Sequence, residues 1–310
     1  MATEQGASWV HRLVVSAAAL LVCGLLPPAL AAQEEQRTFR FAPPDATSYI
    51  ETVSTVQMLD FGGGRTSATK SELQIERRVA RSATSYSLTE AVVGGTSESA
   101  HQERDQAILA AVKGKPVTYI VDSSGHLVNV TGTEPLTEAI RKALPADVAA
   151  LAAKAFTKEA MLAAARADWE ARTEGLIGRS AAPGSAWMAA DSYLLPNGDV
   201  VEHYTALKVA GTGTAGGREW VRVEYRLGRD PDEFRDFLGE SYLSAAAGKQ
   251  ALAGSVTVSG GGYRLVDPAT LLCYGEELER KFGNVTMSAP GVGEIVISLR
   301  QTKSYRYDYR

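Results

Sequence analysis

Glu294–Tyr309, which reads EIVISLRQTKSYRYDY, alternates its side chains with a period of two. Apolar and aromatic side chains share one face of this segment, at Ile295, Ile297, Leu299, Tyr305, Tyr307 and Tyr309. Polar and charged side chains share the other face, at Ser298, Arg300, Thr302, Ser304, Arg306 and Asp308. A period of two predicts a β-strand with one buried face. Sixteen residues span roughly 54 Å at about 3.4 Å each, so we expect the strand to curve around an apolar interior.

Similar strand patterns occur on both sides of the middle of the chain. Val221–Leu227 alternates Val, Tyr and Leu with charged residues, which predicts another half-buried strand. The N-terminal half is rich in Thr, Val, Ser and Tyr, and its glycine pairs and triplets predict hairpin loops. The strands expected there cover residues 48–60, 67–80, 84–93, 116–121 and 127–130.

The middle of the chain has a helical period instead. Thr133 is placed to cap a helix with Pro135 in its first turn, and Ala-rich sequence continues to about Glu174. In its second part Met161, Leu162 and Trp169 share one helical face, which predicts a helix packed on a sheet. Two further helices are expected, one over 104–112 and one opening at Asp230-Pro231 with Phe234, Phe237, Leu238 and Tyr242 on one face.

Together these patterns predict an α+β fold in which long, curved antiparallel sheet packs on Ala-rich helices. The expected divisions are a β-rich half over 32–132, a helical segment over 133–178 and a second β-rich half over 179–310. Val121-Asp122 and Val266-Asp267 occupy similar strand–turn positions. Either the two halves are related to each other, or both sites are ordinary Asp turns.

The N-terminus has the three-part layout of a secretory signal peptide. His11 and Arg12 precede the apolar run Leu13–Leu26, and Ala29-Leu30-Ala31 follows with small residues for a peptidase. The run is about 14 residues, shorter than the roughly 20 that cross a bilayer. We therefore expect cleavage after Ala31 and export to the periplasm or the extracellular space, with no membrane span in the mature chain. Val22 disfavours lipidation of Cys23.

Composition and charge exclude several classes of protein. With 45% apolar and 22% charged residues the chain is an ordinary globular protein, and its net charge of −4 argues against nucleic-acid binding. Cleavage at Ala31 would leave Cys273 as the one cysteine, which excludes an intramolecular disulfide. Asn129 and Asn284 lie in glycosylation sequons, which matter only in a host that uses them.

Motifs for catalysis, metals and cofactors are absent or lie in the wrong context. Gly211–Gly216 (GTGTAG) matches a dinucleotide pattern, but a strand follows where a helix is required, so a hairpin loop is expected. Ser67–Lys70 has a Ser-x-x-Lys spacing, but it begins a polar strand. His101, His126 and His203 show no zinc spacing. The sequence therefore predicts no catalytic residue, no metal and no cofactor.

In its order of elements, residues 38–310 resemble the unclosed β-barrel carriers of the bacterial periplasm, the LolA/LolB-like group. The chain is also similar in layout to exported bacterial proteins of unknown function. The resemblance implies that an apolar ligand such as lipid binds between sheet and helices and that the protein is not an enzyme. It rests on layout, so no residue role is transferred.

Three functions stay open at this stage. A carrier predicts a cavity lined by Met161, Leu162, Trp169 and the apolar face of 295–309. An envelope structural or interaction protein predicts a protein partner and, in place of a cavity, an exposed apolar patch or a free sheet edge, for which the C-terminal strand is the candidate. An exported hydrolase predicts His203 or His126 beside a carboxylate and a hydroxyl in one cleft.

Overall fold

Eleven strands form one antiparallel sheet in the part of the chain that the structure describes. The structure is a computed structural model, and it describes residues 37–100, 102–146, 149, 156–195, 200–215, 217–289 and 293–310. The expected signal peptide and Cys23 lie outside these residues. The strands are β1 (Ser48–Asp60), β2 (Thr66–Arg81), β3 (Ser85–Glu98), β4 (Val117–Asp122), β5 (Leu127–Thr131), β6 (Ala186–Leu194), β7 (Val200–Ala215), β8 (Arg218–Gly228), β9 (Thr257–Val266), β10 (Cys273–Ala289) and β11 (Gly293–Tyr309).

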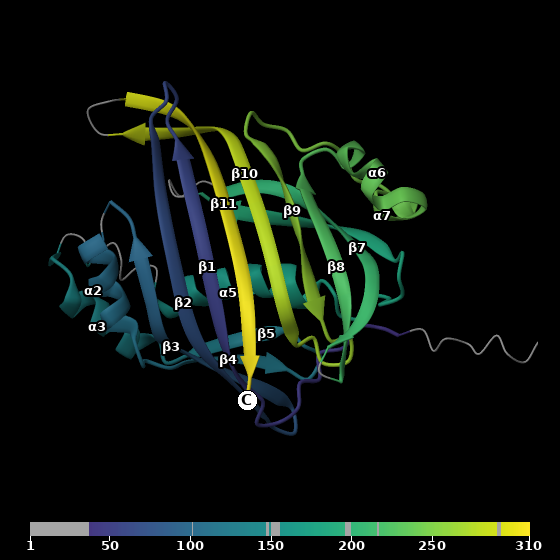
Figure 1. Ribbon diagram of the computed structural model, residues 1–310, viewed down its shortest axis with the longest axis horizontal. Helices are drawn as coiled ribbons and strands as arrows, with labels where there is room; N and C mark the ends of the chain where they lie inside the picture. The colour runs from purple at the N-terminus through teal and green to yellow at the C-terminus, as the bar shows by residue number, and fades with distance from the viewer. Residues whose placement is uncertain are drawn as a thin grey trace, which may run out of the picture. The chain divides into compact units, whose positions relative to one another are not determined.

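The two β-rich halves of the chain join in the middle of this sheet. The strand order is β5-β4-β3-β2-β1-β11-β10-β9-β8-β7-β6, so each half is a meander and the two meet where β1 pairs with β11 (Figure 1). The predicted alternation of β11 is confirmed, since Ile297 and Leu299 are buried and Ser298 and Arg300 are exposed. The expectation of a free edge there is wrong, because β1 and β10 flank β11 on both sides.

The sheet is strongly curved, as its inward side chains show. Tyr193 on the edge strand β6 stacks on Phe282 of β10 with ring centroids 4.6 Å apart, although three strands lie between them in the sheet. Contact over that separation requires the β6–β7 edge to fold back across the concave face. The predicted α+β fold with a long, curved antiparallel sheet is therefore confirmed.

Three helices and a helical turn cover the concave side of the N-terminal half. They are α2 (Gln102–Val112), α3 (Thr133–Ala143), α5 (Lys158–Trp169) and the wider π-helical turn Glu170–Glu174 that continues α5 (Figure 1). Arg166 of α5 donates hydrogen bonds to the carbonyls of Leu127 and Val128, which fixes the helix to β5.

Three local predictions are wrong in detail. Gly132, with φ +84°, occupies the cap position before α3, and Thr133 is the first residue of the helix. A Cβ at position 132 would meet the carbonyl oxygen of Pro116 at 2.6 Å, so glycine is required there. Gly211–Ala215 extends β7 and is not a loop. The helix expected after Asp230 is a series of short turns, including α6 (Arg235–Leu238) and α7 (Tyr242–Ala245), since Gly239 at φ +60° interrupts it. These turns pack on the convex face through Phe234 and Leu238.

Candidate functional site

Helix α5 lies at the centre of the concave face and carries all three candidate ligand-binding residues. Met161 borders a large apolar cavity. Leu162 packs into two neighbouring core clusters. Trp169 packs edge-on against Phe41 with ring centroids 5.2 Å apart, donates its indole N–H to the carbonyl of Gly125 at 2.8 Å, and borders a small cavity of about 100 Å³. The structure thus places Met161 at open space, whereas Leu162 and Trp169 hold the helix in position.

The apolar cavity, of about 390 Å³, lies between β2–β4 on one side and α2, α3 and Met161 on the other. Its walls are mostly aliphatic and aromatic, formed by Leu73, Ile75, Val92, Ile108, Leu109, Val112, Val117, Leu136, Phe156 and Met161. Three charged groups border it, at Glu90, Asp105 and Lys115. A concave site of this size, apolar with a few polar groups, has the properties of small-molecule binding sites.

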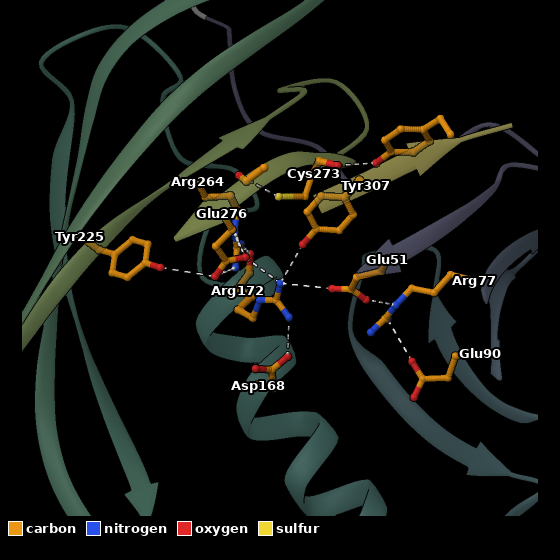
Figure 2. Close-up of polar contacts among 12 residues, drawn as sticks. Glu51, Arg77, Glu90, Asp168, Arg172, Tyr225, Arg264, Cys273, Glu276 and Tyr307 are labelled. Atoms are coloured by element: carbon orange, nitrogen blue, oxygen red, sulfur yellow. Dashed lines mark hydrogen bonds and ion pairs between the residues drawn. The ribbon is translucent and has the colours of Figure 1, made fainter. Parts of the chain in front are cut away.

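A cluster of buried charges lies at the C-terminal end of α5 and adjoins this cavity through Glu90. Arg172 lies at its centre and bridges several strands (Figure 2). Its guanidinium lies 2.7 Å from the carboxylate of Glu276 on β10 and 3.9 Å from that of Glu51 on β1, both of which are 2% exposed. It also donates hydrogen bonds to the Tyr307 hydroxyl and to Asp168, each at 3.1 Å. Arg172 therefore fixes the π-helical turn to the central strands.

Two other arginines balance the remaining charge of the cluster. Arg264 pairs with Glu276 at 3.1 Å, and Arg77 pairs with both Glu51 and Glu90 (Figure 2). Burial by itself would raise the pKa of Glu276, but the positive charges of Arg172 and Arg264 hold that pKa below its usual value. Burial likewise opposes the charge on Arg172, yet Glu276 and Asp168 keep its pKa well above the ordinary value. The cluster is thus a set of mutually neutralised groups.

A second large cavity, of about 520 Å³, lies on the other side of α5 against β6 and β7. Here His203 is 1% exposed, and its Nε2 lies 3.4 Å from the carboxylate of Asp191. The hydrolase hypothesis expects a carboxylate beside this histidine, and Asp191 is one. The nearby hydroxyl of Thr205 donates to Asp191 and not to the imidazole, and Nδ1 faces the Val201 carbonyl at 3.5 Å. Both ring nitrogens thus face oxygen acceptors, and neither is directed at a hydroxyl that it could activate.

The remaining candidates lie apart from these cavities or are unreactive. His126 is exposed and lies between Asp122 at 3.5 Å and Glu174 at 3.2 Å. Burial raises the pKa of the Cys273 thiol to about 11, which opposes thiolate chemistry. The described residues hold no group of three or more His, Cys, Asp or Glu side chains arranged for a metal. Within the same residues, each helix is too short or too polar to cross a bilayer.

No protein-family model and no curated protein matches the chain. Among solved structures it is similar to lipovitellin, in a structure that describes lipid–protein interactions, with 8% identity and a TM-score of 0.45 over 86% of this chain and 25% of that one. A protein with a YmcC-like fold from Bacteroides fragilis has 11% identity and a TM-score of 0.25, covering 87% of this chain and 99% of that one. A DUF1329 family protein from Desulfovibrio piger has 11% identity and a TM-score of 0.14, covering 84% and 86% of the two chains. These scores assign neither a family nor a ligand to this chain.

Proposed function

We propose that the protein is an exported, non-catalytic carrier that binds an apolar ligand, such as a lipid chain, in the 390 Å³ cavity beside Met161. The apolar lining of this cavity is the observation that carries the proposal. Burying a ligand's apolar surface there contributes roughly 25 cal/mol per Å² removed from water. An N-terminal signal peptide would place this activity in the cell envelope or outside the cell.

The three candidate residues on α5, Met161, Leu162 and Trp169, have different roles in this proposal. Met161 forms part of the ligand wall, and methionine adapts its shape to different apolar partners. Leu162 and Trp169 contribute by holding the helix against the strands. In this proposal all three candidate residues serve binding, one by contact and two by position.

The first test is native mass spectrometry of the exported full-length protein, together with an organic extract of the same sample. The carrier proposal predicts a reproducible extra mass that extracts as lipid. Ligand-stripped protein is then titrated with N-phenyl-1-naphthylamine, a neutral fluorophore that brightens in apolar surroundings. A protein that purifies without ligand and also fails to bind the fluorophore would contradict the proposal and favour the envelope interaction protein.

A matched pair of variants tests whether this cavity is the site. Val92 on β3 lines the cavity, whereas Val56 on β1 is 37% exposed on the convex face. Val92→Trp fills the cavity with an indole and should weaken fluorophore binding at least tenfold, whereas Val56→Trp should leave it unchanged. Equal affinity of the two variants would place the bound fluorophore elsewhere on the protein.

A further inference from the structure

Two cations on adjacent central strands face the concave side across from the apolar cavity. Arg280 of β10 lies opposite Gln301 of β11, and Leu278 lies opposite Lys303, so Arg280 and Lys303 are diagonal neighbours on one face. Diagonal neighbours on one face of a sheet are within reach of each other's long side chains, so these two like charges repel. Burial and the charge of Arg280 lower the pKa of Lys303, and the carboxylates of Asp168 and Glu276 offset this only in part.

Neither of these cations forms an ion pair among the described residues, although the charge of Asp168 acts on Lys303 and Arg280 acts on Asp191 at longer range. The Arg280 guanidinium lies over the Tyr193 ring at 5.3 Å from its centroid, and its Nε is buried without a hydrogen-bond acceptor. Lys303 forms no ion pair in the same part of the chain. Arg172 and Arg264 differ, since both pair with Glu276. Arg280 and Lys303 therefore differ from Arg172 and Arg264 in forming no ion pair with a described carboxylate.

A pocket of about 40 Å³ opens beside these two side chains, between α5 and strands β7, β8, β10 and β11. It has room for about three groups of water size, which is the size of a carboxylate. Four cationic side chains and three carboxylates line it, and its apolar floor includes Leu227 and Leu278. Ala171, Asp191, Thr205 and Leu207 line both this pocket and the 520 Å³ cavity, so the two spaces adjoin.

We propose that this pair of spaces binds an amphipathic anion. The carboxylate or phosphate-ester head of the ligand pairs with Lys303 and Arg280. Its apolar chain extends past Leu207 along Trp187 and Ala189 of the 520 Å³ cavity, whose lining also includes Glu170, Asp191 and Glu202. The head supplies an acceptor for the buried Arg280 Nε and a close ion pair for Lys303, and charge-assisted hydrogen bonds are stronger than neutral ones. This site is separate from the cavity lined by Val92, so each can be tested without the other.

The test is calorimetric titration of the ligand-stripped, full-length exported protein, both wild type and carrying Val92→Trp. Decanoate, decyl phosphate and decanol compare anionic with neutral heads on one chain length, and acetate and inorganic phosphate test the head without a chain. We expect the two anionic amphiphiles to bind at least tenfold more tightly than decanol, because a hydrogen bond to a charged group is about that strong. Acetate and phosphate should not compete at the same concentrations.

Charge-removing variants locate the head group. Lys303→Met keeps the length of the side chain and should weaken decanoate binding about tenfold or more while leaving decanol affinity unchanged, and Lys303→Arg should restore it. Lys281→Met is the matched control, since Lys281 is 49% exposed on the opposite face of β10. Arg280→Gln provides a second variant should Lys303→Met lose its circular-dichroism spectrum.

Four results would overturn the proposal. Equal affinity for decanoate and decanol would remove the role of the charge. Unchanged decanoate binding in both Lys303→Met and Arg280→Gln would place the anion elsewhere. Competition by acetate or phosphate at the concentrations of decanoate would indicate a site for small free anions instead of amphiphiles. Loss of decanoate binding in Val92→Trp alone would assign it to the apolar cavity.

Discussion

Replacing Arg172 with methionine should destabilise the protein severely, because Arg172 is the central cation of the buried cluster. The change removes contacts to Glu276 at 2.7 Å and to Asp168 and the Tyr307 hydroxyl at 3.1 Å. It leaves Glu51 and Glu276, each 2% exposed, with one arginine apiece. Removing one member of a buried ion pair typically costs about 3–5 kcal/mol of unfolding free energy, and we expect Arg172→Met to fall in this range at pH 7.

The pH dependence provides a second, independent signature of the same contact. The folded-state pKa of Glu276 is lowered, so the stability it contributes is present above its unfolded value of about 4.3 and is lost as pH falls through the folded value. Without Arg172, Glu276 takes up a proton at higher pH and relieves the uncompensated charge. The deficit of the variant should therefore be smaller at pH 4 than at pH 7.

Urea unfolding followed by circular dichroism at both pH values measures these deficits. Arg300→Met is the matched control, since Arg300 is 57% exposed and pairs with Glu279 on the convex face. Such a surface pair is worth at most about 1 kcal/mol. An Arg172→Met deficit below about 1 kcal/mol, or one that is the same at pH 4 and pH 7, would refute the assignment of Arg172 as the cation that neutralises buried Glu276.

Two further predictions concern reactivity and close packing. Because burial raises the Cys273 pKa to about 11, Ellman's reagent at pH 8 should label the native protein far more slowly than protein in urea, and equal rates would contradict this burial. Gly262→Ala on β9 should destabilise the protein by more than about 1 kcal/mol, because the new Cβ would overlap the backbone carbonyl of Glu277 on β10. Gly211→Ala is its control, since open space surrounds that position; similar unfolding midpoints for the two variants would disprove the close contact.

The sequence was sufficient to predict the strands that carry a clear period of two, whereas β6, β7, β9 and β10 were not assigned ranges. The ranges expected for β1, β2 and β11 agree with the structure within a few residues, and the buried face of β11 is the predicted one. The position of β11 in the sheet was not predictable in this way. Alternation within a strand says which face is buried but not which strands flank it, so the central strand was mistaken for an edge.

The buried charges were missed for a related reason. Glu51, Arg77, Arg172 and Glu276 are far apart in the sequence. The pairing of β1 with β2 brings Glu51 beside Arg77, and the packing of the π-helical turn on the sheet brings Arg172 to Glu51 and Glu276. One signal was available within the C-terminal segment itself. Lys303 lies on the same face as Leu299 and Tyr305, and a charged residue on an otherwise apolar face is the informative exception in a burial pattern.

The cavities follow from the dimensions of the fold. Eleven strands spaced at about 4.8 Å form a sheet roughly 48 Å wide, whereas a helix with its side chains is about 10 Å across. Helix α5 therefore covers only part of the concave face. The curled sheet edges cover more of this face, as do helices α2 and α3. Open space remains beside α5 at Met161 and beside the π-helical turn at Glu170 and Ala171. Because Arg172 binds the end of this helix unit to β1, β10 and β11, it also keeps α5 from shifting into either cavity. The charged cluster does not itself contact an apolar ligand in this proposal. By holding α5 in place it preserves the two spaces in which we propose that ligands bind.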